Sequence, residues 1–142
     1  MRSIKTFINE VLTKGRLLSL ATVDSGGPWV SDVLFVHDKN FCLYWISRKY
    51  RRHSEALRGN PKVAASITII PSPTGKDFGV QLEGTAEELP DVPKIEKAYW
   101  KKRGDGPKLP ITSEHAWYKL TLTKIELIHE SLFGHEKKVF IP

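Results

Sequence analysis

The chain has 142 residues, of which 40% are hydrophobic, so it can bury a core of ordinary size within a single domain over residues 1–142. One cysteine excludes an internal disulfide, and the sequence shows no metal-binding cluster, signal peptide or membrane span. We therefore expect a soluble, cytoplasmic protein, and a net charge of +6 favours anionic partners such as nucleic acid or a phosphorylated cofactor.

The first part of the sequence predicts one helix and then a series of hairpins. Ser3 can cap a helix whose apolar residues recur at helical spacing as far as Gly15. Three strands are predicted over residues 16–23, 29–36 and 41–46, because turns rich in Gly, Pro, Asp and Asn separate three apolar runs.

The rest of the sequence predicts further strands and two more helices. The first of these helices is short, rich in arginine and follows the third strand. Strands are predicted over 62–70, 78–89 and 116–128, a helix from Pro90 to Lys102, and a last strand over 131–141 with a kink at Gly134. With six to seven strands, three short helices and short connections, the sequence predicts a mainly β protein, an antiparallel closed or split β-barrel.

The strongest chemical signal lies where the third strand gives way to the Arg-rich helix. Ser47 falls at this junction, and the helix that follows ends at Gly59 and Asn60 before Pro61. The start of a helix offers backbone N–H groups without partners, and arginine adds charged donors. The junction is therefore a candidate site for a phosphate group.

Several segments occur in an order that is typical of one family. They are the strand 17–23 with its Gly-Gly-Pro turn, the strand 29–36, the junction 43–57, the Asn-Pro-Lys-Val-Ala segment 60–64 and the strand 79–86. Together they cover most of the chain, and the sequence resembles the FMN-binding split-barrel family named after pyridoxamine 5'-phosphate oxidase. The ending over 132–139 resembles a small, uncharacterised bacterial branch of that family.

The resemblance implies a homodimer with FMN at the subunit interface, and it assigns the cofactor-binding residues position by position. Ser47, Arg52 and His53 match the group that contacts the phosphate, and a hydroxyl, a guanidinium and an imidazole can all bind phosphate oxygens. The positions that match residues beside the flavin ring are Ser31, Asp32, Val33, Leu34, Trp45 and Ile46. Gln81 resembles a polar residue that reaches across from the partner's strand.

The resemblance favours a flavin-dependent oxidoreductase that acts on some small molecule other than the vitamin substrate. Val36 and Pro107 stand where the oxidase itself has a lysine and a serine, and the last strand lacks its Arg-x-His pair. No catalytic dyad, nucleophile elbow or P-loop is visible, which agrees with chemistry carried by a cofactor.

Other functions stay open at this stage. A flavin-storage protein would show the same motifs, and a relative that binds haem or a deazaflavin is compatible with the same fold. A nucleic-acid-binding barrel is suggested by the basic charge and by Tyr44, Trp45 and Tyr50, since aromatic residues on a basic groove can stack on bases. It is disfavoured, because the basic residues gather at one junction and no RNA-binding motif occurs.

Overall fold

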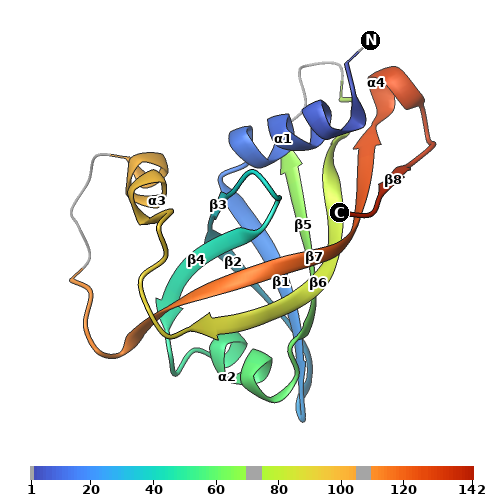
Figure 1. The fold of residues 1–142 in the computed structure, drawn as a ribbon. Coiled ribbons are helices and arrows are strands. Elements are labelled where there is room, and N and C mark those ends of the chain that lie inside the picture. The colour runs from blue at the N-terminus through green and yellow to red at the C-terminus, as the bar shows by residue number, and fades with distance from the viewer. Residues whose placement is uncertain (1, 70–74, 105–109) are drawn as a thin grey trace.

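The computed structural model describes residues 2–69, 75–104 and 110–142 as a strongly curved antiparallel sheet with helices around it (Figure 1). Its strands are β1 (Leu17–Asp24), β2 (Gly27–Leu34), β3 (Val36–His37), β4 (Leu43–Arg48), β5 (Lys62–Ile69), β6 (Phe78–Leu89), β7 (His115–His129) and β8 (Lys138–Phe140). Its helices are α1 (Ile4–Lys14), α2 (Arg52–Gly59), α3 (Glu96–Arg103) and α4 (Glu130–Phe133). The strand order is β2-β1-β5-β6-β7-β4-β3, with β8 paired to β7.

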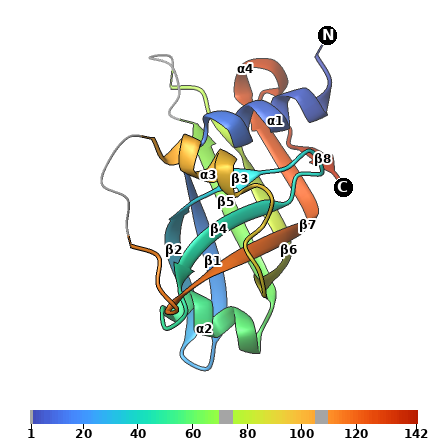
Figure 2. The ribbon, with the colours of Figure 1, turned by 60° about the vertical axis from the view of Figure 1, so that its left-hand side comes forward.

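The curled sheet encloses one main hydrophobic core, because alternate residues of each strand point inward. Leu18 and Leu20 of β1 and Leu120 of β7 are fully buried, whereas their immediate neighbours along the strands are more exposed. α1 closes one end of the barrel and α2 lies at the opposite end (Figures 1 and 2). Within the described part of the chain, no helix combines the length and the apolar character needed to cross a membrane.

A second, smaller cluster holds α3 against the outside of the sheet. Val36, Tyr99 and Trp117 are buried in it, and the rings of Tyr99 and Trp117 meet edge to face with centroids 5.0 Å apart. Edge-to-face packing of aromatic rings adds to the stabilisation that their burial gives. This cluster fixes α3 beside β3 (Figure 2), where its residues Tyr99, Trp100 and Arg103 line the same groove as the end of β4.

The structure confirms the mainly β, antiparallel split barrel and most of the predicted elements. Ser3 caps α1 as expected, since its hydroxyl accepts the N–H of Thr6 at 3.2 Å. Pro107, which stands where the oxidase has a serine, lies outside the described residues.

Two elements in the C-terminal half of the chain were predicted wrongly, the start of α3 and the last strand. α3 begins at Glu96 rather than Pro90, because Pro93 disfavours a helical backbone at the residue before it. The predicted last strand is interrupted: residues 130–133 form α4, which Gly134 ends with φ 59, and only the later β8 is a strand.

Adding a side chain at Gly84 is expected to destabilise the barrel. Gly84 lies at an irregularity in the pairing of β6 with β7, where a Cβ would overlap the Thr121 carbonyl oxygen and come within 2.9 Å of a Leu120 methyl group. We expect Gly84→Ala to lower the free energy of unfolding by about 1–3 kcal/mol, the usual effect of overpacking. Gly59→Ala is the control for urea unfolding, because nothing lies within 4 Å of a Cβ there. Equal losses in both variants would contradict this account.

Candidate functional site

A groove of about 700 Å³ lies between β2, the end of β4, the start of α2 and α3. β4 pairs with β7 along one edge and with β3 along the other. Because β3 follows β2 after a single residue, β2 lies on the same side of β4 as β3. β4 therefore forms the floor of the groove, between β2 and β7. The volume falls in the range of small-molecule sites, roughly 300–1,000 Å³.

The groove brings together most of the residues that the sequence predicted for cofactor binding. They are Ser31, Asp32, Val33, Leu34, Ile46, Ser47, Arg52 and His53. β2 supplies the first four, β4 the next two and α2 the last two. Residues more than 20 positions apart in the sequence thus line one continuous surface, and their proposed contacts to a cofactor stay a prediction.

Trp45 and Gln81 do not line this groove. The indole of Trp45 is fully buried in the core and stacks on Tyr118 at 5.9 Å between centroids, so its side chain does not reach the groove where a flavin would lie. Gln81 lies on β6 at a separate cavity on the outer face of β1, β5 and β6, and its side-chain oxygen accepts a hydrogen bond from Lys137 at 2.8 Å. Its predicted role across a subunit interface stays a prediction.

One corner of the groove joins Ser47 to the start of α2. The Ser47 hydroxyl and Nε2 of His53 form a hydrogen bond of 3.0 Å, and only 7% of His53 is exposed. Arg51, the N-cap residue, has an extended backbone and makes no side-chain capping bond. A helix start without a side-chain cap, next to a hydroxyl and an imidazole, is well suited to hold an anion.

Arg52 is fixed in place by a residue that the sequence prediction did not include. Its Nε and Nη2 donate to the two carboxylate oxygens of Asp24 at 2.9 and 3.0 Å, and its guanidinium lies 4.5 Å from the ring centroid of Trp29. The hydrogen bonds from Arg52, and then from the N–H of Gly26, lower the pKa of Asp24. The hairpin between β1 and β2 therefore holds this arginine at the edge of the groove.

The groove is positively charged, and its cations differ in how they are neutralised. Arg48 pairs with Glu114 at 3.1 Å, and Arg52 pairs with Asp24. Arg51 has no acidic partner within 4.0 Å among the described residues, so its charge adds to the attraction for an incoming anion. Asp32 also lines the groove, and its carboxylate accepts a hydrogen bond from the hydroxyl of Ser19 at 2.6 Å.

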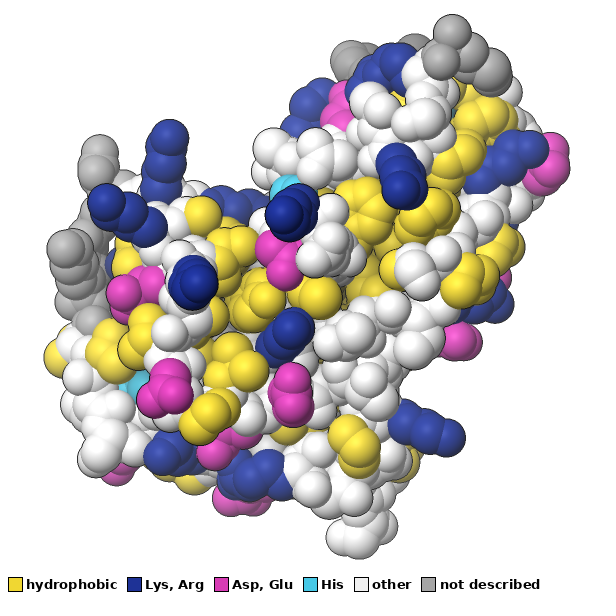
Figure 3. Space-filling model, in the orientation of Figure 1, with side chains coloured by type: hydrophobic (Ala, Val, Ile, Leu, Met, Phe, Trp, Pro, Cys, Tyr) yellow, Lys and Arg dark blue, Asp and Glu magenta, His cyan; other side chains and the backbone are white. Residues whose placement is uncertain are grey.

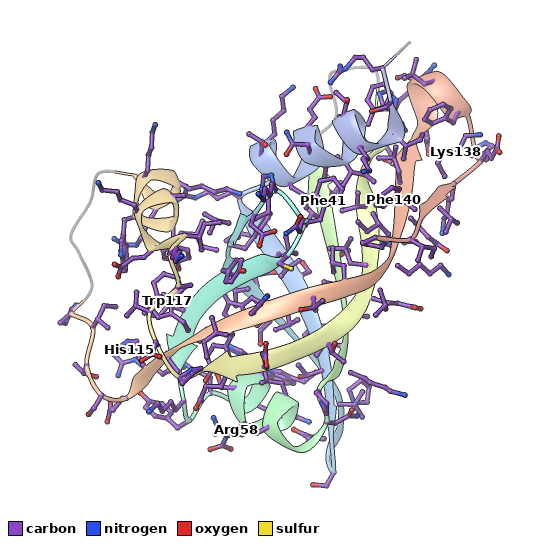
Figure 4. The ribbon with its side chains drawn as sticks, in the orientation of Figure 1. Phe41, Arg58, His115, Trp117, Lys138 and Phe140 are labelled. Carbon is purple, nitrogen blue, oxygen red and sulfur yellow. The ribbon has the colours of Figure 1, made fainter. Side chains whose placement is uncertain are left out.

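Further groove residues, absent from the predicted set, lie on α3 and at the start of β7. Tyr99, Trp100 and Arg103 come from α3, and His115 is the first residue of β7 (Figure 4). Tyr99 is buried, which raises the pKa of its hydroxyl above the ordinary value. The sequence spacing marks Tyr99 and Arg103 as one helix face, but only the packing of α3 shows that this face meets β4.

His53 is expected to make the stability of the protein depend on pH. Burial, and then the charge of Arg51, lower its pKa from 6.5, so the unfolded chain binds the proton more readily than the folded one. Stability should be complete above about pH 6.5 and fall as the pH drops below it, with a contribution of the same sign from His37. Urea unfolding at several pH values should show a flatter dependence for His53→Gln. An unchanged dependence would contradict this assignment.

Comparison with known proteins places this chain in a family. The family model described as pyridoxamine 5'-phosphate oxidase matches residues 4–129. A UPF0306 protein of Yersinia enterocolitica is 27% identical over 136 residues, which cover 94% of this chain and 89% of that protein.

Solved structures share the fold at lower sequence identity. An FAD-binding protein from Mesorhizobium loti superposes with a TM-score of 0.66 at 21% identity, over 87% of this chain and 92% of that one. A heme binding protein from Mycobacterium smegmatis gives 0.74 at 16% identity, over 99% of this chain and 59% of that one. Because the family model spans most of the sequence, in agreement with the motif order and the split barrel, the chain belongs to the pyridoxamine 5'-phosphate oxidase family.

Proposed function

We propose that the chain binds FMN in the groove and acts as a flavin-dependent oxidoreductase on a small molecule. The observation that carries this proposal is the corner where Ser47, His53 and the start of α2 meet beside Arg51 and Arg52. Such a set of donors fits a phosphate group better than a neutral ligand, because charge-assisted hydrogen bonds are the stronger ones.

The rest of the groove has both apolar and polar lining residues, which suit a flavin ring. Val33, Leu34 and Ile46 offer apolar contacts next to the hydroxyl of Ser31 and the carboxylate of Asp32. When bound, FMN supplies the hydride or electron transfer, and the chain's own residues bind the phosphate, orient the ring and limit access of water. This division of labour explains how a flavoenzyme can lack a catalytic dyad.

The proposal includes a homodimer, which the family resemblance implies. Leu17 and Val30 are 51% and 61% exposed on neighbouring strands, close to the cavity on the outer face that Val30, Ala64 and Gln81 line. A second copy covering this face would remove apolar surface from water and bring Gln81 to the interface. Light scattering of the purified protein tests this part, and a monomer at micromolar concentration would count against it.

The central experiment compares FMN with riboflavin, which lacks the phosphate. Titration followed by flavin fluorescence should show saturable FMN binding and at least about tenfold weaker riboflavin binding, since one charge-assisted contact contributes about 1.5–3 kcal/mol. No binding of FMN, or equal affinity for both flavins, would refute the phosphate corner. Bleaching of the bound flavin by NADH or NADPH would then separate an oxidoreductase from a storage protein.

The remaining alternatives are decided by the same titration. If haem or a deazaflavin were the resident cofactor, it would displace FMN, or it would bind to the protein when FMN does not. A heme binding protein is among the solved structures that share this fold. A nucleic-acid-binding role has less support: on the face shown in Figure 3, Lys and Arg side chains are interspersed with Asp and Glu rather than gathered in one stripe.

A further inference from the structure

His115 stands where the groove meets a second cavity. It is the first residue of β7 and lines the groove on the side away from β2. Together with Ile46 and Ile111 it also lines an adjoining cavity of about 340 Å³, which Trp117 and Leu89 help to form (Figure 4). Its ring can therefore contact a molecule that occupies either space.

The turn before β7 fixes which ring nitrogen of His115 carries the proton. The backbone N–H of Thr112 donates to Nδ1 at 3.1 Å, and the Thr112 hydroxyl lies 3.2 Å from the same nitrogen. A backbone N–H can only donate, so Nδ1 must accept, and the proton of the neutral ring sits on Nε2. The N–H of His115 donates in turn to the Thr112 carbonyl at 3.0 Å, which holds the turn closed.

The hydrogen on Nε2 has no acceptor among the described residues, whereas the neighbouring guanidinium of Arg48 is engaged. Arg48, the cross-strand neighbour of His115, donates to Glu114 and to the Tyr50 hydroxyl, both at 3.1 Å. Because His115 is only half-buried, it presents an oriented and accessible donor to a molecule in the groove.

We propose that His115 is the specificity-determining donor of this site, and that its Nε2–H binds a carbonyl or carboxylate oxygen of the small-molecule substrate. The proposal rests on the proposed flavin function and deepens it, because it names the substrate class as a compact molecule with an acceptor oxygen. The position fits such a partner: the floor of β4 separates His115 from β2, where the flavin ring is proposed to lie. A substrate held by His115 would occupy the space between that ring and the second cavity.

Two substitutions test the donor directly, because they keep different halves of the imidazole. The amide nitrogen of His115→Gln can take the place of Nε2, whereas that of His115→Asn lies near Nδ1 and leaves no donor toward the groove. Benzoate, a carboxylate without donors, is the probe, titrated into the protein with and without FMN. We expect His115→Gln to stay within about threefold of the parent and His115→Asn to bind benzoate about tenfold more weakly. Equal affinities of the two variants would overturn the proposal.

A spectroscopic readout makes the test independent of flavin chemistry. Nitrogen chemical shifts of His115 in the ligand-free protein, measured well above neutral pH, should show a proton on Nε2, and benzoate should move that signal. A proton on Nδ1, or an Nε2 signal that benzoate leaves unchanged, would overturn the proposal. Failure of the flavin function is seen separately, as the absence of FMN binding in the parent protein, and is not confused with these outcomes.

Discussion

Replacing Trp45 with alanine is expected to lower the free energy of unfolding by about 3–5 kcal/mol, the range for truncating a large buried aromatic side chain. The indole is fully buried at the centre of the barrel and lies almost parallel to the Tyr118 ring, with an interplanar angle of 14°. Its loss would leave a cavity between β4 and β7 that the packed core cannot fill completely. Urea unfolding followed by circular dichroism measures the effect.

Two controls separate the volume of the indole from its other properties. Trp45→Phe keeps most of the ring and removes Nε1, a buried donor that has no hydrogen-bond partner among the described residues, so we expect a loss below about 1.5 kcal/mol. Trp29→Ala removes an indole that is 44% exposed and should cost less stability than Trp45→Ala. A Trp45→Ala protein of parental stability that had lost flavin binding would show instead that this indole serves the cofactor.

Trp45 also shows what a motif match cannot predict, namely whether a side chain reaches the groove. The family resemblance matches it to a position next to the flavin. Leu43 and Trp45 share one face of β4 and are both fully buried, because this part of the strand lies over the core. Of the two residues adjacent to Trp45, only Ile46 reaches the groove. A motif aligns positions along the chain, whereas the depth of a side chain in the core decides whether it can reach a ligand: Ser47, two residues after Trp45, lies at the end of the strand and lines the groove.

The barrel was predictable because its strands carry a period of two and its turns carry Gly, Pro, Asp and Asn. The parts of the site that escaped prediction depend on tertiary contacts. Asp24 meets Arg52 across 28 positions, and His115 enters the groove only because α3 and the turn at Thr112 fold against β4. Neither contact has a local signal in the sequence. Residues 130–133 look like part of a strand, but they form a helical turn that ends at Gly134.

Replacing Arg52 with alanine is expected to weaken FMN binding by about 1.5–3 kcal/mol, the contribution of a hydrogen bond to a charged group, which is roughly 10- to 100-fold in Kd. Asp24 engages Nε and one hydrogen of Nη2, so three of the five guanidinium hydrogens stay available to phosphate oxygens. The substitution also leaves the Asp24 carboxylate without its cation near the phosphate, which adds repulsion to the lost contact. Fluorescence titration with FMN at low salt measures the change.

Arg58→Ala is the matched control, because it removes an arginine from the same helix away from the groove. Arg58 donates to the Lys49 carbonyl at 2.8 Å and to Glu88 at 3.3 Å, and it extends from α2 as Figure 4 shows. Its loss changes the net charge by the same amount, so a purely long-range effect would appear equally in both variants and would fade with added salt. Riboflavin affinity should be unchanged in Arg52→Ala, since the lost contact is to the phosphate. If Arg52→Ala weakened riboflavin and FMN alike, the arginine would act on the ring or on the fold. The phosphate would then have to lie elsewhere in the groove, for example beside Arg51.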